Sequence, residues 1–402
     1  MNVQTPQFQS AESEELLALG TAPIPAGRYY RDDYFELERE AIFKRSWLHV
    51  GHVCELPEPG SFIVRELDFA KASILICRDK EGAIRAFHNV CTHRGTQLVV
   101  ETEGKRSSFS CRYHAWTFGN DGELRAAPDF ERFYVERKDC GLPKVAVDVC
   151  AGLIFVNLDP APKQSLREYI GPLAEQMETR PVAKATTFSE YVYEIDANWK
   201  LTYDNFQENY HLRFIHPRSG AAAGGADNPF GYPVEYGLHG QHRTQLIWSH
   251  PSPPVTAVQG FAMGKGIPLA FAEAGVAPSR LDKQYFALFP NFFLFGSPGT
   301  HFSHTVFPIS ATRSRGVIRL YWVGDDDSAT RRFAREYQMA TALDIHAEDR
   351  AVIEAGQRGL NSGALKVIHL QSQEVLLRHL INEVDRAVEA YKAERAQAGD
   401  AK

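Results

Sequence analysis

The hydrophobic pattern changes character along the chain. Between residues 50 and 160, short apolar or alternating runs are separated by Gly, Pro and Asp-Gly turns, which is typical of a small all-β region. Before this region we expect a short helix within 32–53, with Phe35, Ile42 and Phe43 on one face. The expected strands are 61–67, 72–78, 83–90 and 152–158.

The second half of the chain predicts strands first and long helices afterwards. A strand at 188–195 precedes a helix at 197–212, which Asn198 would cap. Residues 217–275 are rich in Gly, Ala and Pro, show little periodicity and predict a long loop of unspecified conformation. The remaining expected elements are strands at 284–297, 300–310 and 316–324, and helices at 329–359, ending at Gly359, and 372–395. This order favours an α+β fold over a doubly wound sheet.

Composition mainly excludes classes of partner. The 402 residues carry a formal net charge of −6, which gives no electrostatic footprint for nucleic acid or an anionic membrane. No run of eighteen apolar residues occurs, and the first twenty residues lack the basic and apolar regions of a signal peptide. Six cysteines are too sparse for a disulfide framework in a chain of this length. We therefore expect a cytoplasmic protein with no nucleic-acid or membrane partner.

Two mixed pairs of metal-ligating residues lie inside the predicted all-β region. Cys91 and His93 are separated by one residue, and Cys111 and His114 by two. A structural zinc site would usually pair Cys with Cys and His with His. One Cys and one His in each pair instead suit a [2Fe–2S] cluster with two thiolates on one iron and two imidazoles on the other. A chance grouping is the third alternative.

A second group of candidate ligands lies at the end of the predicted helix 197–212. Non-haem Fe(II) oxygenases bind iron through two His and one carboxylate, and leave positions open for O₂. His211 and His216 could supply the two imidazoles. Five residues of helix would turn them about 140° apart, so the helix must end or distort between them. Glu208, three residues before His211, could hydrogen-bond that imidazole.

These residues resemble a known family. The pattern Cys91-x-His93-x₁₇-Cys111-x₂-His114 is similar to the Rieske motif, and "NWKLTYDNFQENYHLRFIH" is similar to the catalytic domain of Rieske non-haem iron oxygenases. The resemblance implies that the third iron ligand is Asp349, eight residues before "QRGL", with Glu348 and Asp344 as rivals. It implies a small all-β Rieske domain at 46–162 and a helix-grip catalytic domain at 163–402, on which residues 1–45 would pack.

The resemblance also implies how electrons travel. Glu208 would bridge the iron ligand of one subunit to the Rieske His114 of its neighbour in a homotrimer. Asp204 is the rival bridge. A separate reductase or ferredoxin would supply the electrons, because no nicotinamide-binding motif occurs in this chain. A small β subunit could join the trimer.

The expected function is that of a terminal oxygenase with a [2Fe–2S] cluster and Fe(II). Mono- or dioxygenation of an aromatic compound, in aromatic hydrocarbon catabolism, is the leading hypothesis. Oxidative N-demethylation or hydroxylation of a quaternary ammonium compound is the alternative. Glu at position 208 favours this alternative, because many aromatic-ring dioxygenases have Asp there. A non-catalytic Rieske electron carrier is the alternative of another class. The expected substrate-pocket residues are Asn205, Leu212, Phe214 and Phe293.

Overall fold

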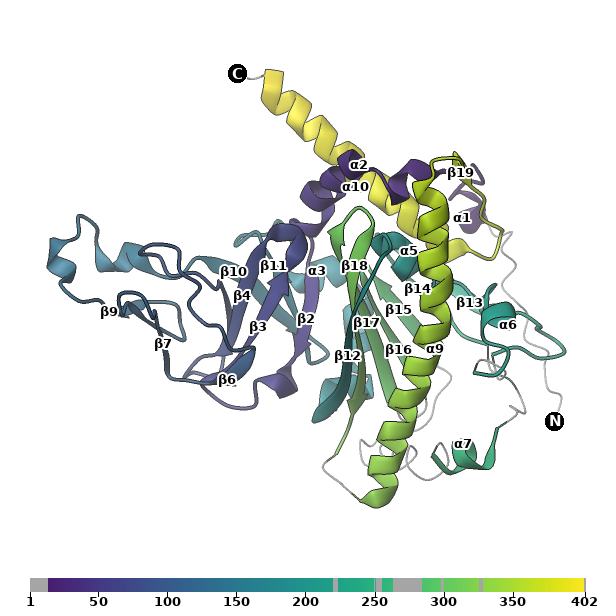
Figure 1. Cartoon of the computed structure of the whole chain (residues 1–402), viewed down its shortest axis with the longest axis horizontal. Coiled ribbons are helices and arrows are strands. Elements are labelled where there is room, and N and C mark those ends of the chain that lie inside the picture. Colours follow the sequence, from purple (N-terminus) through teal and green to yellow (C-terminus); the bar gives the residue numbers. More distant parts are fainter. Residues whose placement is uncertain are drawn as a thin grey trace. The chain divides into compact units, whose positions relative to one another are not determined.

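The computed structural model describes residues 14–219, 223–248, 250, 255–262, 284–297, 300–324 and 328–400. It divides into two compact units (Figure 1). One is continuous, Phe43–Glu178, and the other joins Met1–Ile42 to Thr179–Lys402. Residues 163–178, which the sequence placed with the second domain, therefore fold with the first. Among the described helices, none combines the length and apolarity needed to cross a bilayer.

The continuous unit is built from antiparallel strands. A seven-stranded sheet has the order β2-β11-β10-β5-β4-β3-β6, and a small sheet has the order β7-β8-β9. The strands expected at 61–67 and 72–78 are found with those bounds. The elements are β2 (Leu48–His52), β3 (Ser61–Leu67), β4 (Ala72–Arg78), β5 (Ile84–His88), β6 (Glu103–Lys105), β7 (Ser108–Ser110), β8 (Thr117–Gly119), β9 (Leu124–Ala126), β10 (Lys144–Cys150), β11 (Leu153–Asn157), α3 (Leu166–Ile170) and α4 (Leu173–Glu178).

The second unit is organised around one curled antiparallel sheet, in the order β12-β18-β17-β16-β15-β14-β13. Consecutive strands β13 to β18 are neighbours, and β12 closes the far edge against β18. Its strands are β12 (Thr187–Ile195), β13 (Glu235–His239), β14 (His242–Leu246), β15 (Gln284–Leu288), β16 (Phe292–Ser297), β17 (Thr300–Ser310) and β18 (Arg313–Trp322). A short pair, β1 (Ile24–Pro25) and β19 (Val367–Ile368), lies outside this sheet.

Two of these strands contradict the prediction of one long loop at 217–275. The hairpin of β13 and β14 turns at Gly240, whose φ of +61° is the left-handed conformation that glycine adopts most easily. Four consecutive residues of β14, His242 to Gln245, are polar and buried. A strand that buries polar side chains shows no hydrophobic alternation, which explains why β14 was not predicted from the sequence. Part of the predicted loop (220–222, 249, 251–254 and 263–275) lies outside the described residues.

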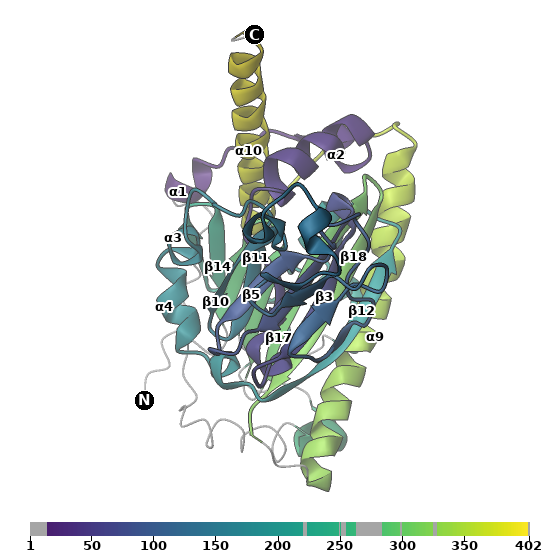
Figure 2. The same cartoon turned by 90° about the vertical axis from the view of Figure 1, so that its left-hand side faces the viewer.

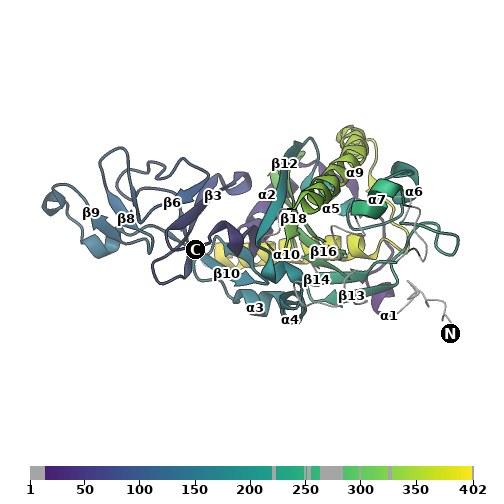
Figure 3. The same cartoon turned by 90° about the horizontal axis from the view of Figure 1, so that it is seen from below.

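Helices flank the sheet. Helix α9 runs along one face of the sheet (Figures 1 and 3), and α10 contacts α2 and β14 (Figure 2). The helices of this unit are α1 (Glu14–Leu17), α2 (Asp32–Glu38), α5 (Trp199–Asp204), α6 (Leu212–Ile215), α7 (Ala257–Phe261), α9 (Ala329–Asn361) and α10 (Val375–Asp400). Helix α9 passes Gly359, the expected end, and stops before Gly363, which has a φ of +67°.

The helix predicted at 197–212 is broken, and the break shapes the site. Asn198 caps α5 as expected, its side-chain oxygen accepting from the Lys200 N–H at 3.0 Å. After Asp204 the N–H groups of Phe206 and Gln207 bond back only three residues, so the helix tightens and ends. Helix α6 then begins after His211 and ends before His216, so the predicted helix stops before both histidines and a separate four-residue helix lies between them.

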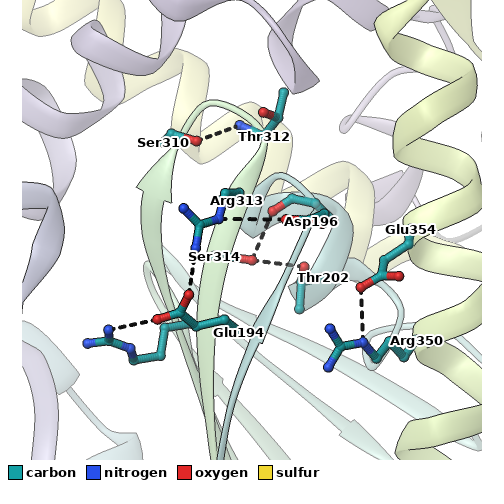
Figure 4. A network of polar contacts seen from close by, with 11 residues as sticks. Glu194, Asp196, Thr202, Ser310, Thr312, Arg313, Ser314, Arg350 and Glu354 are labelled. Carbon is teal, nitrogen blue, oxygen red and sulfur yellow. Dashed lines mark hydrogen bonds and ion pairs between the residues drawn. The ribbon is translucent and has the colours of Figure 1, made fainter.

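Polar contacts fix α5 to the sheet and to the N-terminal segment. Ser314 on β18 donates to the Ala197 carbonyl at 2.9 Å and lies 3.1 Å from the Thr202 hydroxyl (Figure 4). On the other side, the fully buried Lys200 ammonium lies 2.6 Å from the equally buried Glu38 carboxylate of α2. Since α5 leads directly into the segment 205–216, these contacts position the candidate ligands.

Candidate active site

Three side chains from two distant parts of the chain meet at the end of α6. His211 and His216 flank that four-residue helix, and Asp349 lies on α9. Oδ1 of Asp349 lies 2.8 Å from Nε2 of His216 and 3.6 Å from Nε2 of His211. One potential ligand atom from each residue falls within 4.8 Å of the other two. Two imidazoles and one carboxylate on a shared point are the donor set of a mononuclear Fe(II) site.

Each histidine is held by a carboxylate through its other ring nitrogen. Nδ1 of His211 bonds to Glu208, which also accepts the backbone N–H groups of Tyr210 and His211. Nδ1 of His216 lies 2.7 Å from Oε2 of Glu348. A protonated Nδ1 leaves the Nε2 lone pair for a metal, so both carboxylates set the required tautomer.

The buried atoms of this site fit an iron ion. Nε2 of His216 and Oδ1 of Asp349 are buried, and within the described part of the chain neither has a hydrogen-bond partner. Their 2.8 Å approach therefore brings two unpartnered acceptors together, which is costly without a cation between them. The donor set and its geometry both suit Fe(II).

The four candidate cluster ligands lie on two loops of the same construction. In each six-residue loop the N–H of the Cys bonds to the carbonyl of the sixth residue, Thr96 or Trp116, at 2.8 Å. The fifth residue, Gly95 or Ala115, donates back to the carbonyl of the Cys and has a positive φ, +74° or +57°. The repeated loop presents one Cys and one His from each side.

The side chains of these loops suit a [2Fe–2S] cluster. Cys91 and Cys111 are buried and free of disulfides. The imidazoles of His93 and His114 are 4.6 Å apart between centroids, and Nδ1 of His93 is buried without a partner among the described residues. His93 also stacks on Trp116 at 5.0 Å, which fixes the plane of the ring.

A cavity of about 360 Å³ opens on the iron ligands. One wall is a row of cross-strand neighbours, aligned by the sheet register: Gln245 on β14, Tyr285 on β15, Phe295 on β16, Phe302 on β17 and Leu320 on β18. A stripe of α9 forms another wall, at the spacing of one helix face: Gln338, Thr341, Ala342, Ile345 and Asp349. Phe206 and Phe293 bring the aromatic rings to five.

Three of the four expected substrate-pocket residues line the cavity. Asn205, Leu212 and Phe293 line the cavity, but Phe214 does not: its side chain is 62% exposed and lies against Tyr210 and Phe230. Asp204, the rival bridge, is buried and accepts a hydrogen bond from Tyr29 at 3.1 Å.

Neither rival of Asp349 supplies the third ligand atom. Glu348 bonds to His216 Nδ1 rather than joining the three ligand atoms, and Asp344 is exposed. Glu348 was not predicted from sequence as a partner of His216. The α9 stripe was not predicted either, although the spacing of its residues before Asp349 indicates one helix face.

Comparison with known proteins assigns both units. Residues 46–146 match the model of the Rieske [2Fe–2S] domain, and residues 182–390 match that of the ring-hydroxylating α subunit, catalytic domain. The oxygenase subunit of glycine betaine monooxygenase from Pseudomonas aeruginosa is 34% identical over 194 residues, which is 48% of this chain and 44% of that one. The match thus spans less than half of that relative.

Two further relatives extend the comparison over most of the chain. The oxygenase subunit of carnitine monooxygenase from Acinetobacter pittii is 29% identical over 346 residues, 84% of this chain and 85% of that one. A crystal structure of a quaternary ammonium Rieske monooxygenase in complex with an inhibitor has a TM-score of 0.73 at 25% identity, and covers 91% of this chain and 96% of that one. The Rieske domain binds a [2Fe–2S] cluster and the catalytic domain a mononuclear iron. The chain belongs to the ring-hydroxylating α-subunit family of Rieske oxygenases.

Proposed function

We propose that this protein is the terminal oxygenase of a Rieske system that oxidises a quaternary ammonium compound, by N-demethylation or by hydroxylation. The names of its relatives support this alternative rather than aromatic-ring hydroxylation, our leading expectation from sequence. The three converging ligand atoms argue against a pure electron carrier, because a carrier needs no second iron site.

The observation that carries the substrate class is the lining of the cavity. Five aromatic rings surround it, and neither Lys nor Arg occurs among the described residues of its walls. Aromatic faces attract a desolvated tetraalkylammonium group through their negative quadrupole. An aromatic acid would need a cation in the wall, and Arg213, two residues after His211, is exposed and lies against Phe230.

The residues divide the work of the reaction. His211, His216 and Asp349 would hold the iron, which supplies O₂ binding and activation when present. Glu208 and Glu348 keep both imidazoles in the required tautomer. The five aromatic rings of the cavity exclude water and hold a substrate carbon toward the ligands.

The partners follow from the same assignment. Cys91, His93, Cys111 and His114 would hold the cluster that receives electrons from a separate reductase or ferredoxin. Glu208 would connect His211 to His114 of a neighbouring subunit in a homotrimer. Analytical ultracentrifugation of the loaded protein would test the trimer.

A single-turnover experiment tests the reaction without the natural reductase. Loaded protein is chemically reduced, freed of excess reductant, and mixed with ¹⁸O₂ and either glycine betaine, carnitine, choline or naphthalene. Hydroxylation consumes one C–H bond, one O₂, two electrons and two protons, and releases one water. We expect an oxidised product from at least one quaternary ammonium compound, with one ¹⁸O delivered to it or to the released aldehyde. A naphthalene diol as the only product would contradict the proposal.

A further inference from the structure

Two amide side chains in the cavity wall each leave one polar atom without a hydrogen-bond partner among the described residues. Gln245 is 3% exposed, and its side-chain oxygen has no hydrogen-bond partner among the described residues. The side-chain nitrogen of Asn205 is buried and equally unpartnered. The other short polar side chains with described contacts are engaged: Asn209 donates to the Gly231 carbonyl at 2.6 Å, and Thr341 to the Tyr337 carbonyl at 2.9 Å.

An unpartnered buried amide is destabilising unless something in the cavity bonds to it. Each such group loses its hydrogen bonds to water on folding and gains none in return. In the cross-strand row, the side-chain oxygen of Gln245 has no partner among the described residues, whereas the Tyr285 hydroxyl donates to the Phe206 carbonyl at 2.8 Å. The row therefore ends in an amide oxygen that can accept a hydrogen bond from a ligand.

The charge of the walls limits what that ligand can carry. The charged side chains described there are acidic, Glu208 and Asp349, with no Lys or Arg beside them. Arg243, two residues before Gln245 on β14, does not line the cavity and directs Nε and Nη2 to Gln207 Oε1, at 3.1 and 2.9 Å. A carboxylate buried beside Gln245 would be costly because no Lys or Arg among the described wall residues would pair with it.

We propose that Gln245 and Asn205 select a quaternary ammonium substrate whose tail ends in an uncharged hydrogen-bonding group, such as a hydroxyl, over one whose tail ends in a carboxylate. A hydroxyl both donates and accepts, so it satisfies either amide whichever way that amide is turned. A carboxylate only accepts. This inference rests on the proposed function and specifies its substrate class.

Three trimethylammonium probes of similar size test the selection. Choline carries a hydroxyl, glycine betaine a carboxylate, and propyltrimethylammonium an apolar tail. Their dissociation constants are measured by anaerobic calorimetry on protein loaded with both cofactors. We expect choline to bind about tenfold more tightly than either of the other two, the effect of one buried hydrogen bond.

Variants locate the selection. Gln245→Met should weaken choline about tenfold and leave propyltrimethylammonium within about twofold, and Asn205→Leu should act in the same direction. Thr341→Val is the matched control within the cavity, because its hydroxyl already bonds to Tyr337. An unchanged Rieske signal and thermal midpoint verify that the variants fold.

The possible failures are distinguishable. Glycine betaine binding as tightly as choline, or equal losses for choline and propyltrimethylammonium in Gln245→Met, would overturn the role of the amides and leave the proposed function standing. Binding of naphthalene with none of the three cations would overturn the proposed function itself.

Discussion

The imidazole of His216 and the carboxylate of Glu348 lie 2.7 Å apart, between Nδ1 and Oε2, although 132 positions separate them in the sequence. Glu348 also accepts the Ser219 hydroxyl at 2.5 Å. It immediately precedes Asp349, so one turn of α9 supplies both a candidate iron ligand and the group that orients another. Glu208 bonds to Nδ1 of His211 in the same way. Both imidazoles are thus held by a carboxylate at Nδ1, the ring nitrogen that faces away from the candidate metal position.

Glu348→Gln should weaken Fe(II) binding at the mononuclear site by about 10–100-fold, the usual effect of losing a partner of a ligand histidine. The amide can still bond to His216 but no longer raises the basicity of its ring. Equilibrium dialysis against Fe(II) buffers, after removal of the mononuclear iron alone, would measure the change.

Glu354→Gln is the control for that variant. Glu354 lies on the same helix, five residues after Asp349, and pairs with Arg350 at 2.9 Å (Figure 4). Its iron affinity should equal that of the wild type. Equal affinities in Glu348→Gln and the wild type would show that Glu348 does not support the metal.

The buried pair of Lys200 and Glu38 should be strongly coupled. Removing one partner leaves an uncompensated charge in the interior, so Lys200→Met alone should cost about 3–5 kcal/mol in the free energy of unfolding. Adding Glu38→Leu should restore part of that loss, because the stranded charge disappears. Urea unfolding of the single and double variants measures the coupling, and additive losses would refute it. Asp33→Asn, in an exposed pair with Arg31, should change little.

Asp204 should make stability depend on pH. Burial raises the pKa of its carboxyl to about 7, against the lowering effects of the Tyr29 hydrogen bond and of the Lys200 and Arg243 charges. In the unfolded chain an Asp has a pKa near 3.9. The neutral form is therefore favoured on folding, and stability is lost as the pH rises from about 4 to about 7.

Asp204→Asn removes this dependence and keeps an acceptor for Tyr29. Its free energy of unfolding, relative to that of the wild type, should be higher at pH 8 than at pH 5.5. Urea titrations at both pH values, followed by tryptophan fluorescence, measure the difference. The same relative stability at both pH values would mean that Asp204 does not titrate as described.

The left-handed conformation of Ala115 should make the second cluster loop sensitive to side-chain shape. At a φ of +57°, Ala115→Gly should be tolerated, whereas Ala115→Val should cost on the order of 1–2 kcal/mol or more. We expect faster loss of the Rieske EPR signal on heating for the Val variant. Ala126→Val, on the exposed side of strand β9, is the control. Equal lifetimes in the two Val variants would contradict the strain argument.

Local motifs made the metal centres predictable. Each pair of cluster ligands lies within four residues, and His211, Glu208 and His216 lie within nine, so residue type and spacing indicated metal ligands, and the family resemblance identified the two centres. The strands of the β-unit could be predicted for a similar reason, because β3 and β4 each contain a short run of apolar and β-branched residues, at 62–64 and 74–77.

Features that depend on register between distant elements escaped prediction. The role of Glu348 depends on where α9 lies against the segment after α6. The cavity wall depends on the alignment of Gln245 with Tyr285 and Phe295 across three strands. Strand β14 was missed because it buries polar residues. The helix at 197–212 was extended too far because its tightening after Asp204 is not visible in hydrophobic spacing.

Iron and sulfide counting, on the wild type and on Asp349→Ala, tests the central claim most directly. We expect three irons and two sulfides per chain in the wild type. The variant should hold two of each, with the Rieske EPR signal unchanged, because the cluster does not depend on Asp349. Three irons in the variant, or two in both proteins after Fe(II) reconstitution, would contradict a mononuclear iron held by His211, His216 and Asp349.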